Sequence, residues 1–280
     1  MRAEINNKYR NSNLYICVVL SYLMLYLNYR LRARHRNGRG IHPPFAYKMV
    51  NGVIYGRGPD APGLAKIEAY RHDLLKISNT IHVEDHGAGS SRGGDRERRI
   101  CDLVRHTAVS PRRGHLLARL ADHLKPDTMI ELGTGPGIGS LYLALGNPGG
   151  LLHTCEGSPA IAHLAEKGFE NLGVRNIEVH RGLFAEMLPG LLNHAGPGLL
   201  VFIDGDHREE KLVSYVSRIL ASKRQDLSIV IDDIHWSKGM YGAWKRIIKR
   251  PDIRLSIELF NTGIVFVKEK IQKDHFVVIF

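Results

Sequence analysis

From residue 126 onwards, the sequence alternates short apolar segments with amphipathic ones, and this alternation constrains the fold more than any other feature. The apolar segments are predicted strands, and the amphipathic segments are predicted helices. Parallel strands need such crossover helices, so the pattern predicts an α/β fold with a mostly parallel sheet. The predicted strands are 128–133, 151–157, 176–180, 199–204, 227–233, 254–260 and 263–268. Two residues separate the last two strands, which predicts an antiparallel hairpin and seven strands in all.

The residues before this pattern are predicted to form helices at 61–79, 95–108 and 112–124, with a Gly/Ser-rich loop at 84–94. The sequence therefore divides into four parts. These are a basic arm with an apolar helix (1–40), a helical cap (41–119), the α/β domain (120–270) and a C-terminal tail (271–280).

The net charge of +11 lies in the N-terminal part of the chain. Residues 1–40 hold eight Lys/Arg and one acid, residues 92–119 hold eight Arg and three acids, and residues 120–280 are nearly neutral. A nucleic-acid-binding surface would need basic side chains on the α/β domain itself, so nucleic acid is a disfavoured partner. The three cysteines are scattered, which excludes a disulfide framework and favours a cytoplasmic location.

Residues 14–27 form an uncharged apolar run, and five arginines follow by residue 39. A membrane-spanning helix needs about 20 apolar residues, so a packed helix or a homo-oligomer interface is the favoured interpretation. The second is that residues 14–39 contact or anchor to the inner face of the membrane, with the basic flank on the cytoplasmic side. The third is that translation starts at Met24. The run lacks a small-residue cleavage site, so a removed signal peptide is not expected.

A glycine-rich segment, Glu131-Leu-Gly-Thr-Gly-Pro-Gly-Ile-Gly139, follows the first strand and opens a helix. Glycines there let the backbone turn tightly and approach a bound ligand. Ile138 stands where the dinucleotide fingerprint G-x-G-x-x-G has its third glycine, which disfavours a nicotinamide dehydrogenase. Glu156 ends the second strand, where an acid can accept hydrogen bonds from both hydroxyls of a ribose.

With this loop and this acid, residues 110–270 resemble the class I S-adenosylmethionine-dependent methyltransferases, which have a Rossmann-like fold. Residues 120–270 would then be the cofactor-binding catalytic domain. The resemblance implies that the methionine part of the cofactor is surrounded by Glu131, Gly133, Thr134, Gly135 and Gly137, its ribose is held by Glu156, and its adenine lies by Gly182 and Phe184.

Two acidic motifs end the fourth and fifth strands: Ile203-Asp-Gly-Asp-His207 and Ile231-Asp-Asp-Ile-His-Trp236. The carboxyl ends of neighbouring parallel strands face one crevice, so these side chains are expected to lie close together. Four acids and two histidines would repel one another unless a cation lies among them. The sulfonium group of the cofactor and a divalent metal are both cations of this kind.

These motifs resemble those of the catechol and caffeoyl-coenzyme-A O-methyltransferases. That resemblance implies that Asp204, Asp232 and Asp233 bind Mg²⁺ or another divalent cation, which would orient and acidify the acceptor hydroxyl. The chain departs from the pattern with Asp233 in place of Asn and His207 in place of Lys. His207 would serve as the general base. Alternatively, Asp204 binds the cofactor's ammonium group, and Asp232 and Asp233 cap the next helix.

Three further segments, 41–45, 83–90 and 232–237, resemble a group of uncharacterised bacterial methyltransferases. Segment 83–90 is interpreted as a lid over the cofactor or as a solvated linker. His235 is expected to be mainly a structural histidine, with substrate contact as the alternative. Trp236 and Trp244 are expected to be packing residues.

The sequence therefore predicts an S-adenosylmethionine-dependent methyltransferase that acts on a hydroxyl oxygen of a small molecule, with Asp204 and His207 as catalytic residues. A nucleic-acid (RNA) methyltransferase is the first alternative, although the N/D-P-P-Y/F motif of base N-methylation is missing after the fourth strand. A non-catalytic cofactor-binding or membrane-associated scaffold is the second, and the complete glycine loop argues against it. The acceptor could be a phenol, a sugar hydroxyl or a lipid-linked hydroxyl.

Overall fold

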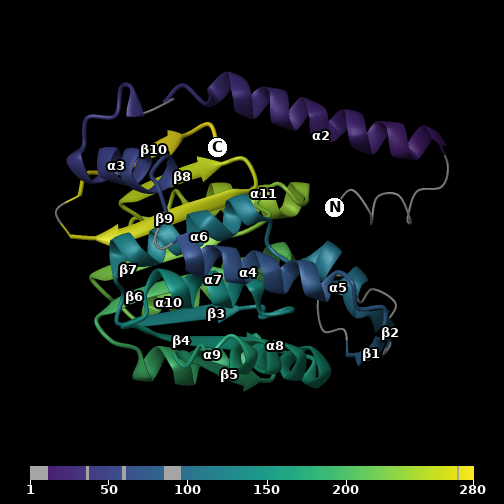
Figure 1. Ribbon diagram of the computed structural model, residues 1–280. Helices are drawn as coiled ribbons and strands as arrows, with labels where there is room; N and C mark the ends of the chain where they lie inside the picture. Colours follow the sequence, from purple (N-terminus) through teal and green to yellow (C-terminus); the bar gives the residue numbers. More distant parts are fainter. Residues whose placement is uncertain (1–11, 36–37, 59–60, 85–95, 270) are drawn as a thin grey trace.

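A computed structural model describes residues 12–35, 38–58, 61–84, 96–269 and 271–280 of the chain. An eight-stranded sheet runs through its centre in the order β10-β8-β9-β7-β6-β3-β4-β5 (Figure 1). The strands are β3 (Thr128–Leu132), β4 (Leu151–Glu156), β5 (Ile177–Arg181), β6 (Gly198–Ile203), β7 (Asp226–Ile231), β8 (Leu255–Leu259), β9 (Thr262–Lys268) and β10 (Asp274–Val277).

The predicted parallel sheet is confirmed. Strands β7, β6, β3, β4 and β5 are parallel, while β9 runs antiparallel to both β7 and β8, so β8 and β9 form the predicted hairpin. The strand count differs from the prediction, because the sequence predicts a tail at 271–280 whereas Asp274–Val277 pair with β8 as an eighth strand. Phe276 and Val277 are buried there, and this burial explains why the segment joins the sheet.

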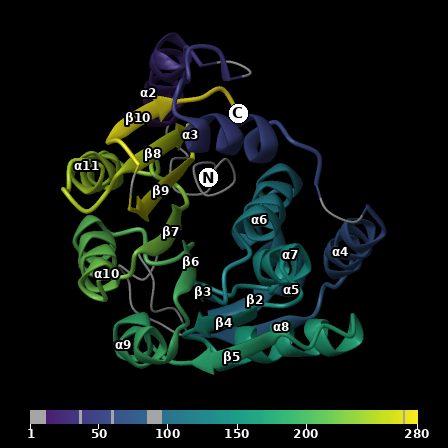
Figure 2. The ribbon, with the colours of Figure 1, turned by 90° about the vertical axis from the view of Figure 1, so that its left-hand side faces the viewer.

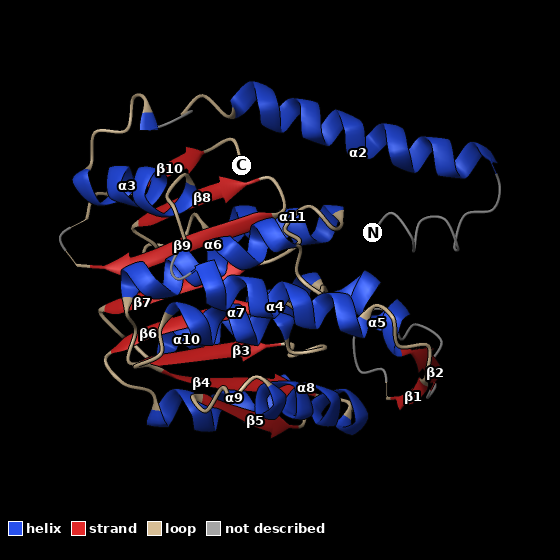
Figure 3. Cartoon of the chain, in the orientation of Figure 1, coloured by secondary structure: helices blue, strands red, loops and turns tan. Residues whose placement is uncertain are grey.

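Helices cover both faces of the sheet and give three layers (Figures 2 and 3). Helices α6 (Pro111–Leu124), α7 (Ile138–Gly146) and α8 (Pro159–Asn171) lie on one face, with α4 (Ala61–Leu74) outside α7. Helices α9 (Phe184–His194), α10 (Glu209–Ala221) and α11 (Lys238–Ile247) lie on the other. Two separate apolar clusters fill the spaces on the two sides of the sheet. The sheet is therefore buried on both faces, which explains why its strands are almost continuously apolar.

The segment before the α/β domain differs in part from its prediction. The predicted helix at 95–108 begins at residue 100, as α5 (Ile100–Thr107), because Arg96–Arg99 form a strand, β2, that pairs antiparallel with β1 (Thr80–Val83). Two short helical elements, α3 (Pro44–Lys48) and the π-helix η2 (Met49–Ile54), pack beside the sheet. Most of the predicted lid at 83–90 lies outside the described residues, which resume at 96.

The first described element, α2 (Ser12–Arg32), contacts the C-terminal strands along one side. The hydroxyl of the buried Tyr29 donates to the backbone carbonyl of Val278, and Arg32 forms a 2.6 Å ion pair with Glu258 of β8. The other side exposes large apolar residues, among them Met24 and Leu31. Among the described residues, no helix has both the length and the apolar character needed to cross a membrane.

Candidate functional site

A cavity of about 420 Å³ opens at the carboxyl ends of the parallel strands. Its lining comes from the glycine loop after β3, from the segments that follow β4, β5 and β6, and from residues 103–109 before the α/β domain. Eight of the residues predicted to bind a cofactor line it: Glu131, Gly133, Thr134, Gly135, Glu156, Gly182, Phe184 and Asp204. The structure thus brings these residues together from four different strand ends.

Two glycines of the loop have different structural roles. Gly133 has φ +112°, and a Cβ there would lie 2.3 Å from the carbonyl oxygen of Asp204, so only glycine lets β3 pass so close to the end of β6. Gly137 has φ +81°, and a Cβ there would lie 2.7 Å from the ring of Phe169 in α8. Gly137 is the N-cap residue of α7 and is not among the residues that line the cavity, so its contact with the cofactor stays a prediction.

Glu131 is buried beneath the loop and is fixed by two hydroxyl groups. Ser140 donates to its Oε2, and Thr154 donates to the same atom at 2.6 Å. Burial raises the pKa of Glu131 to about 7, against the opposite effect of these two hydrogen bonds. The protonation state of the cavity floor therefore changes near neutral pH.

Glu156 connects the end of β4 to the glycine loop. The backbone N–H of Gly135 donates to its Oε2 at 3.0 Å, and the backbone N–H of Ser158 donates to its Oε1 at 2.9 Å. Both carboxylate oxygens are thus oriented by the backbone. The predicted acid at the end of the second strand is accordingly held in one position on the cavity wall.

At the ends of β6 and β7, the acids lie close together, and an arginine that the sequence did not single out lies among them. Arg113 of α6 donates through Nη1 to Oδ2 of Asp232, and the same nitrogen is 3.4 Å from Oδ1 of Asp233. Asp232 is buried and accepts a second hydrogen bond, at 3.1 Å, from the hydroxyl of Thr262. The cation expected among these acids is therefore supplied by the chain itself.

These charges alter one another's ionisation. Burial and the neighbouring Asp232 raise the pKa of Asp204 well above its ordinary value, while Arg113 opposes this rise. Burial alone would lower the pKa of Arg113, but the charges of Asp232, Asp233 and Asp204 outweigh it and raise that pKa. The arginine is thus firmly protonated, while Asp204 holds a proton more readily than an exposed aspartate.

This arrangement does not fit a divalent metal held by Asp204, Asp232 and Asp233. Both oxygens of Asp232 already have protein partners, and the guanidinium of Arg113 lies against two of the three acids. A metal held by these acids would have to take the place of Arg113, whose ion pair with Asp232 is largely buried. The three acids are brought together as the sequence predicts, but with a protein cation among them.

The histidines of the two acidic motifs lie in different surroundings. His207 is half-buried beside Trp236, with ring centroids 5.7 Å apart. Burial raises the pKa of Asp233, and the charge of His207 opposes this rise. The described wall of the cavity does not include His207, so its role as general base stays a prediction. His235 is buried, stacks 4.4 Å from Tyr241 and bonds through Nδ1 to the carbonyl of Phe260. It has the contacts of a structural histidine.

Sequence reasoning also missed part of the cavity wall. Arg208, Lys211 and Tyr215 line it beside Phe184, together with Asp206, which the sequence had placed among the acids of the crevice. The side chain of Asp206 binds Arg208 and accepts a hydrogen bond from the hydroxyl of Tyr215 at 3.0 Å. Tyr215 and Lys211 lie in α10, where an amphipathic pattern does not distinguish a cavity-lining side chain from a packed or solvated one.

Comparison with known proteins points to one class of enzyme. Residues 130–234 match a family model described as a methyltransferase domain. The chain is 34% identical over 129 residues to a catechol O-methyltransferase of Mycobacterium tuberculosis, a match that covers 45% of this chain and 57% of that protein. It is 31% identical over 130 residues to a catechol O-methyltransferase of Niastella koreensis, covering 45% of this chain and 58% of that protein. The chain thus spans less than two thirds of the length of these relatives.

The fold is also that of solved methyltransferase structures. An O-methyltransferase from Bacillus cereus in complex with SAH superposes with a TM-score of 0.54 at 20% identity, covering 75% of this chain and 92% of that one. The match to the family model runs from within β3 to just beyond β7, and it includes the glycine loop, Glu156 and the strand-end acids. Over residues 130–234, the chain is therefore similar to a methyltransferase domain, and the relatives that it resembles there are O-methyltransferases.

Proposed function

We propose that this chain is an S-adenosylmethionine-dependent methyltransferase that transfers a methyl group to a hydroxyl oxygen of a small molecule. The observation that carries the proposal is the convergence of three groups on one cavity: the glycine loop after β3, Glu156 at the end of β4 and Asp204 after β6. Each has a chemistry that one part of the cofactor needs. The likeness to catechol O-methyltransferases supports oxygen as the acceptor atom.

Glu156 would hold the ribose. Its two oxygens are oriented by the N–H groups of Gly135 and Ser158. A carboxylate held in this way is an acceptor that can bind the hydroxyls of a ribose. Phe184, which is half-buried in the wall next to Gly182, would pack against the adenine.

Two buried acids make the cavity suited to positive charge. The cofactor carries a sulfonium and an ammonium group, and it supplies an electrophilic methyl group. Glu131 and Asp204 both line the cavity, and burial raises the pKa of both. A cation beside them favours their ionised forms, so we expect cofactor binding to release protons near neutral pH.

The reaction is an in-line displacement in which the acceptor oxygen bonds to the methyl carbon while the carbon–sulfur bond breaks and its electron pair stays on sulfur. The hydroxyl proton must pass to a base. Asp204 lies in the cavity wall with a raised pKa and is the favoured acceptor of that proton, and His207, beside Asp233, is the second candidate. Arg113 offsets the charge of Asp232 and Asp233. Holding the cofactor and the acceptor in line supplies much of the rate.

The test is calorimetry of S-adenosylmethionine binding to the full chain. We expect one site per chain, and Glu156→Gln is expected to weaken binding by about tenfold or more, because it removes a charged acceptor of hydrogen bonds. Glu170→Gln, at an exposed position of α8, is the matched control and should bind as the unmodified chain does. Absence of binding by the unmodified chain would overturn the proposal.

A further inference from the structure

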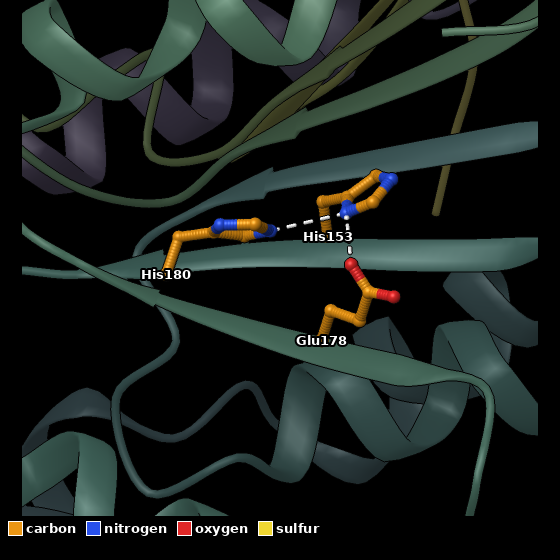
Figure 4. Close-up of side chains that lie close together, drawn as sticks. All are labelled: His153, Glu178 and His180. Carbon is orange, nitrogen blue, oxygen red and sulfur yellow. Dashed lines mark hydrogen bonds and ion pairs between the residues drawn. The ribbon is translucent and has the colours of Figure 1, made fainter. Parts of the chain in front are cut away.

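A second cluster of potential ligands lies outside the cavity, on β4 and the edge strand β5 (Figure 4). His153 pairs in register with Glu178, and His180 lies two residues further along β5. Side chains alternate between the faces of a strand, so Glu178 and His180 project from the same face as His153. That face is the one covered by α9, since Cys155 of β4 belongs to the same apolar cluster as Leu188.

The three side chains converge on a single atom. Nδ1 of His153 lies 3.0 Å from Nε2 of His180 and 3.2 Å from Oε2 of Glu178. In a tetrahedral zinc site with bonds of about 2.0–2.1 Å, neighbouring ligand atoms are about 3.3 Å apart. The ligand atoms of this cluster all lie within 4.8 Å of one another, so their spacing is already close to the spacing that a metal ion requires.

Hydrogen bonding alone serves this arrangement less well. A neutral His153 has one ring proton, and if Nδ1 carries it, the proton is shared between a carboxylate oxygen and another imidazole nitrogen. If Nδ1 lacks the proton, it can accept a hydrogen bond from His180, but no proton then lies between it and the carboxylate of Glu178. A single cation between the three ligand atoms would be bound by all three groups at once.

The cluster is also open to the surroundings. The side chain of Glu178 is 57% exposed, so an ion can reach the cluster from solvent.

We propose that His153, Glu178 and His180 form a binding site for a divalent transition metal, with zinc as the best-matched ion. Two imidazoles and one carboxylate are a ligand set that zinc accepts, with water in the fourth position, whereas magnesium prefers oxygen ligands. The ion would fasten the edge strand β5 to β4. None of the three residues lines the described wall of the cavity, so this proposal is independent of the proposed methyl transfer.

The experiment is a titration of the untagged full chain, stripped with a chelator and dialysed, with zinc chloride in a calorimeter. We expect saturation at one equivalent and a rise in the thermal midpoint of unfolding. Cobalt chloride in place of zinc should give the visible absorption of tetrahedral Co²⁺. His153→Ala and Glu178→Gln should each weaken zinc binding by about tenfold or more, in line with the loss that even indirect supports of a metal site cause.

The matched control is His163→Ala, at an exposed histidine of α8 that lies 3.9 Å from Glu166 and should leave zinc binding unchanged. Glu178→Gln changes an exposed side chain and keeps its shape, so it tests the site even if His153→Ala fails to fold. Zinc binding that is absent, or that is equal in the unmodified chain and in Glu178→Gln, would overturn the proposal. S-adenosylmethionine binding, measured on the same samples, reports separately on the proposed function.

Discussion

Within the described residues, two groups of side chains with metal-binding chemistry differ in what lies among them. At the ends of β6 and β7, the guanidinium of Arg113 contacts Asp232 and Asp233, and the charge of Asp204 also acts on it. On β4 and β5, His153 and its neighbours instead converge on one ring nitrogen. The sequence motif is clearer in the first cluster, but the geometry suits a metal better in the second. A set of ligands predicts a metal only when the chain supplies no cation of its own.

The largest effect is expected from a change to Asp204, the acid of this cluster that lines the cavity. Asp204→Asn should lower the rate of methyl transfer by about 10²–10⁴-fold, because it removes the favoured proton acceptor. Because the pKa of Asp204 is raised in the folded state, the folded state loses stability as the pH rises above the pKa of an ordinary aspartate. The variant should therefore be more stable than the unmodified chain at pH 8.

Turnover and denaturant unfolding check both parts of this prediction for Asp204→Asn. Asp252→Asn is the control, because Asp252 is an exposed acid paired with Arg250. A variant at position 204 with normal turnover would remove Asp204 from the mechanism.

The second prediction removes the cation and tests the contrast between the clusters directly. Arg113→Ala should destabilise the fold by about 3–5 kcal/mol, since it leaves Asp232 buried without its charged partner. Mg²⁺ should raise the thermal midpoint of this variant and leave that of the unmodified chain unchanged, because only the variant has an uncompensated acid cluster.

Arg112→Ala is the matched control. Arg112 is the neighbouring arginine, and its guanidinium lies over the ring of Phe280. The same contrast predicts that chelators leave the turnover of the unmodified chain unaffected. Loss of turnover with a chelator and its recovery with Mg²⁺ would show that a metal displaces Arg113 in the working enzyme.

The smallest expected effect concerns pH and Glu131. Its pKa rises from 4.5 to about 7 on folding, so the folded state binds the extra proton and loses about 3 kcal/mol of stability as the pH increases across that interval. Glu131→Gln should remove this loss and be more stable than the unmodified chain at pH 8, but not at pH 4. Denaturant unfolding at the two pH values measures the difference, and equal pH dependence in both chains would contradict the prediction.

The sequence predicted the parts of the fold that depend on local pattern. The parallel strands, the glycine turn at Gly133 and the acids at strand ends are each encoded by a short contiguous stretch of sequence. Asp274–Val277 were missed because a four-residue strand at a sheet edge carries little periodicity. Arg96–Arg99 were missed because a run of charged residues does not resemble a strand until its partner β1 is known.

The missed site residues share a different cause. Arg113 and Asp232 are 119 positions apart, and an arginine in the first turns of an amphipathic helix resembles any solvated base. His153 and Glu178 occupy polar positions of half-buried strands, where alternation alone explains them. Only the register between β4 and β5 makes them neighbours, and the sequence does not specify that register.

The contact between Tyr29 and Val278 has a consequence for how the chain reaches its final form. The two residues are 249 positions apart, and Arg32 likewise needs Glu258. During synthesis, helix α2 leaves the ribosome long before β8 and β10 exist, so its tyrosines have no surface on which to pack. The apolar helix therefore stays undocked until the final strands have been synthesised. For this chain, docking of the first described helix is among the last events of folding.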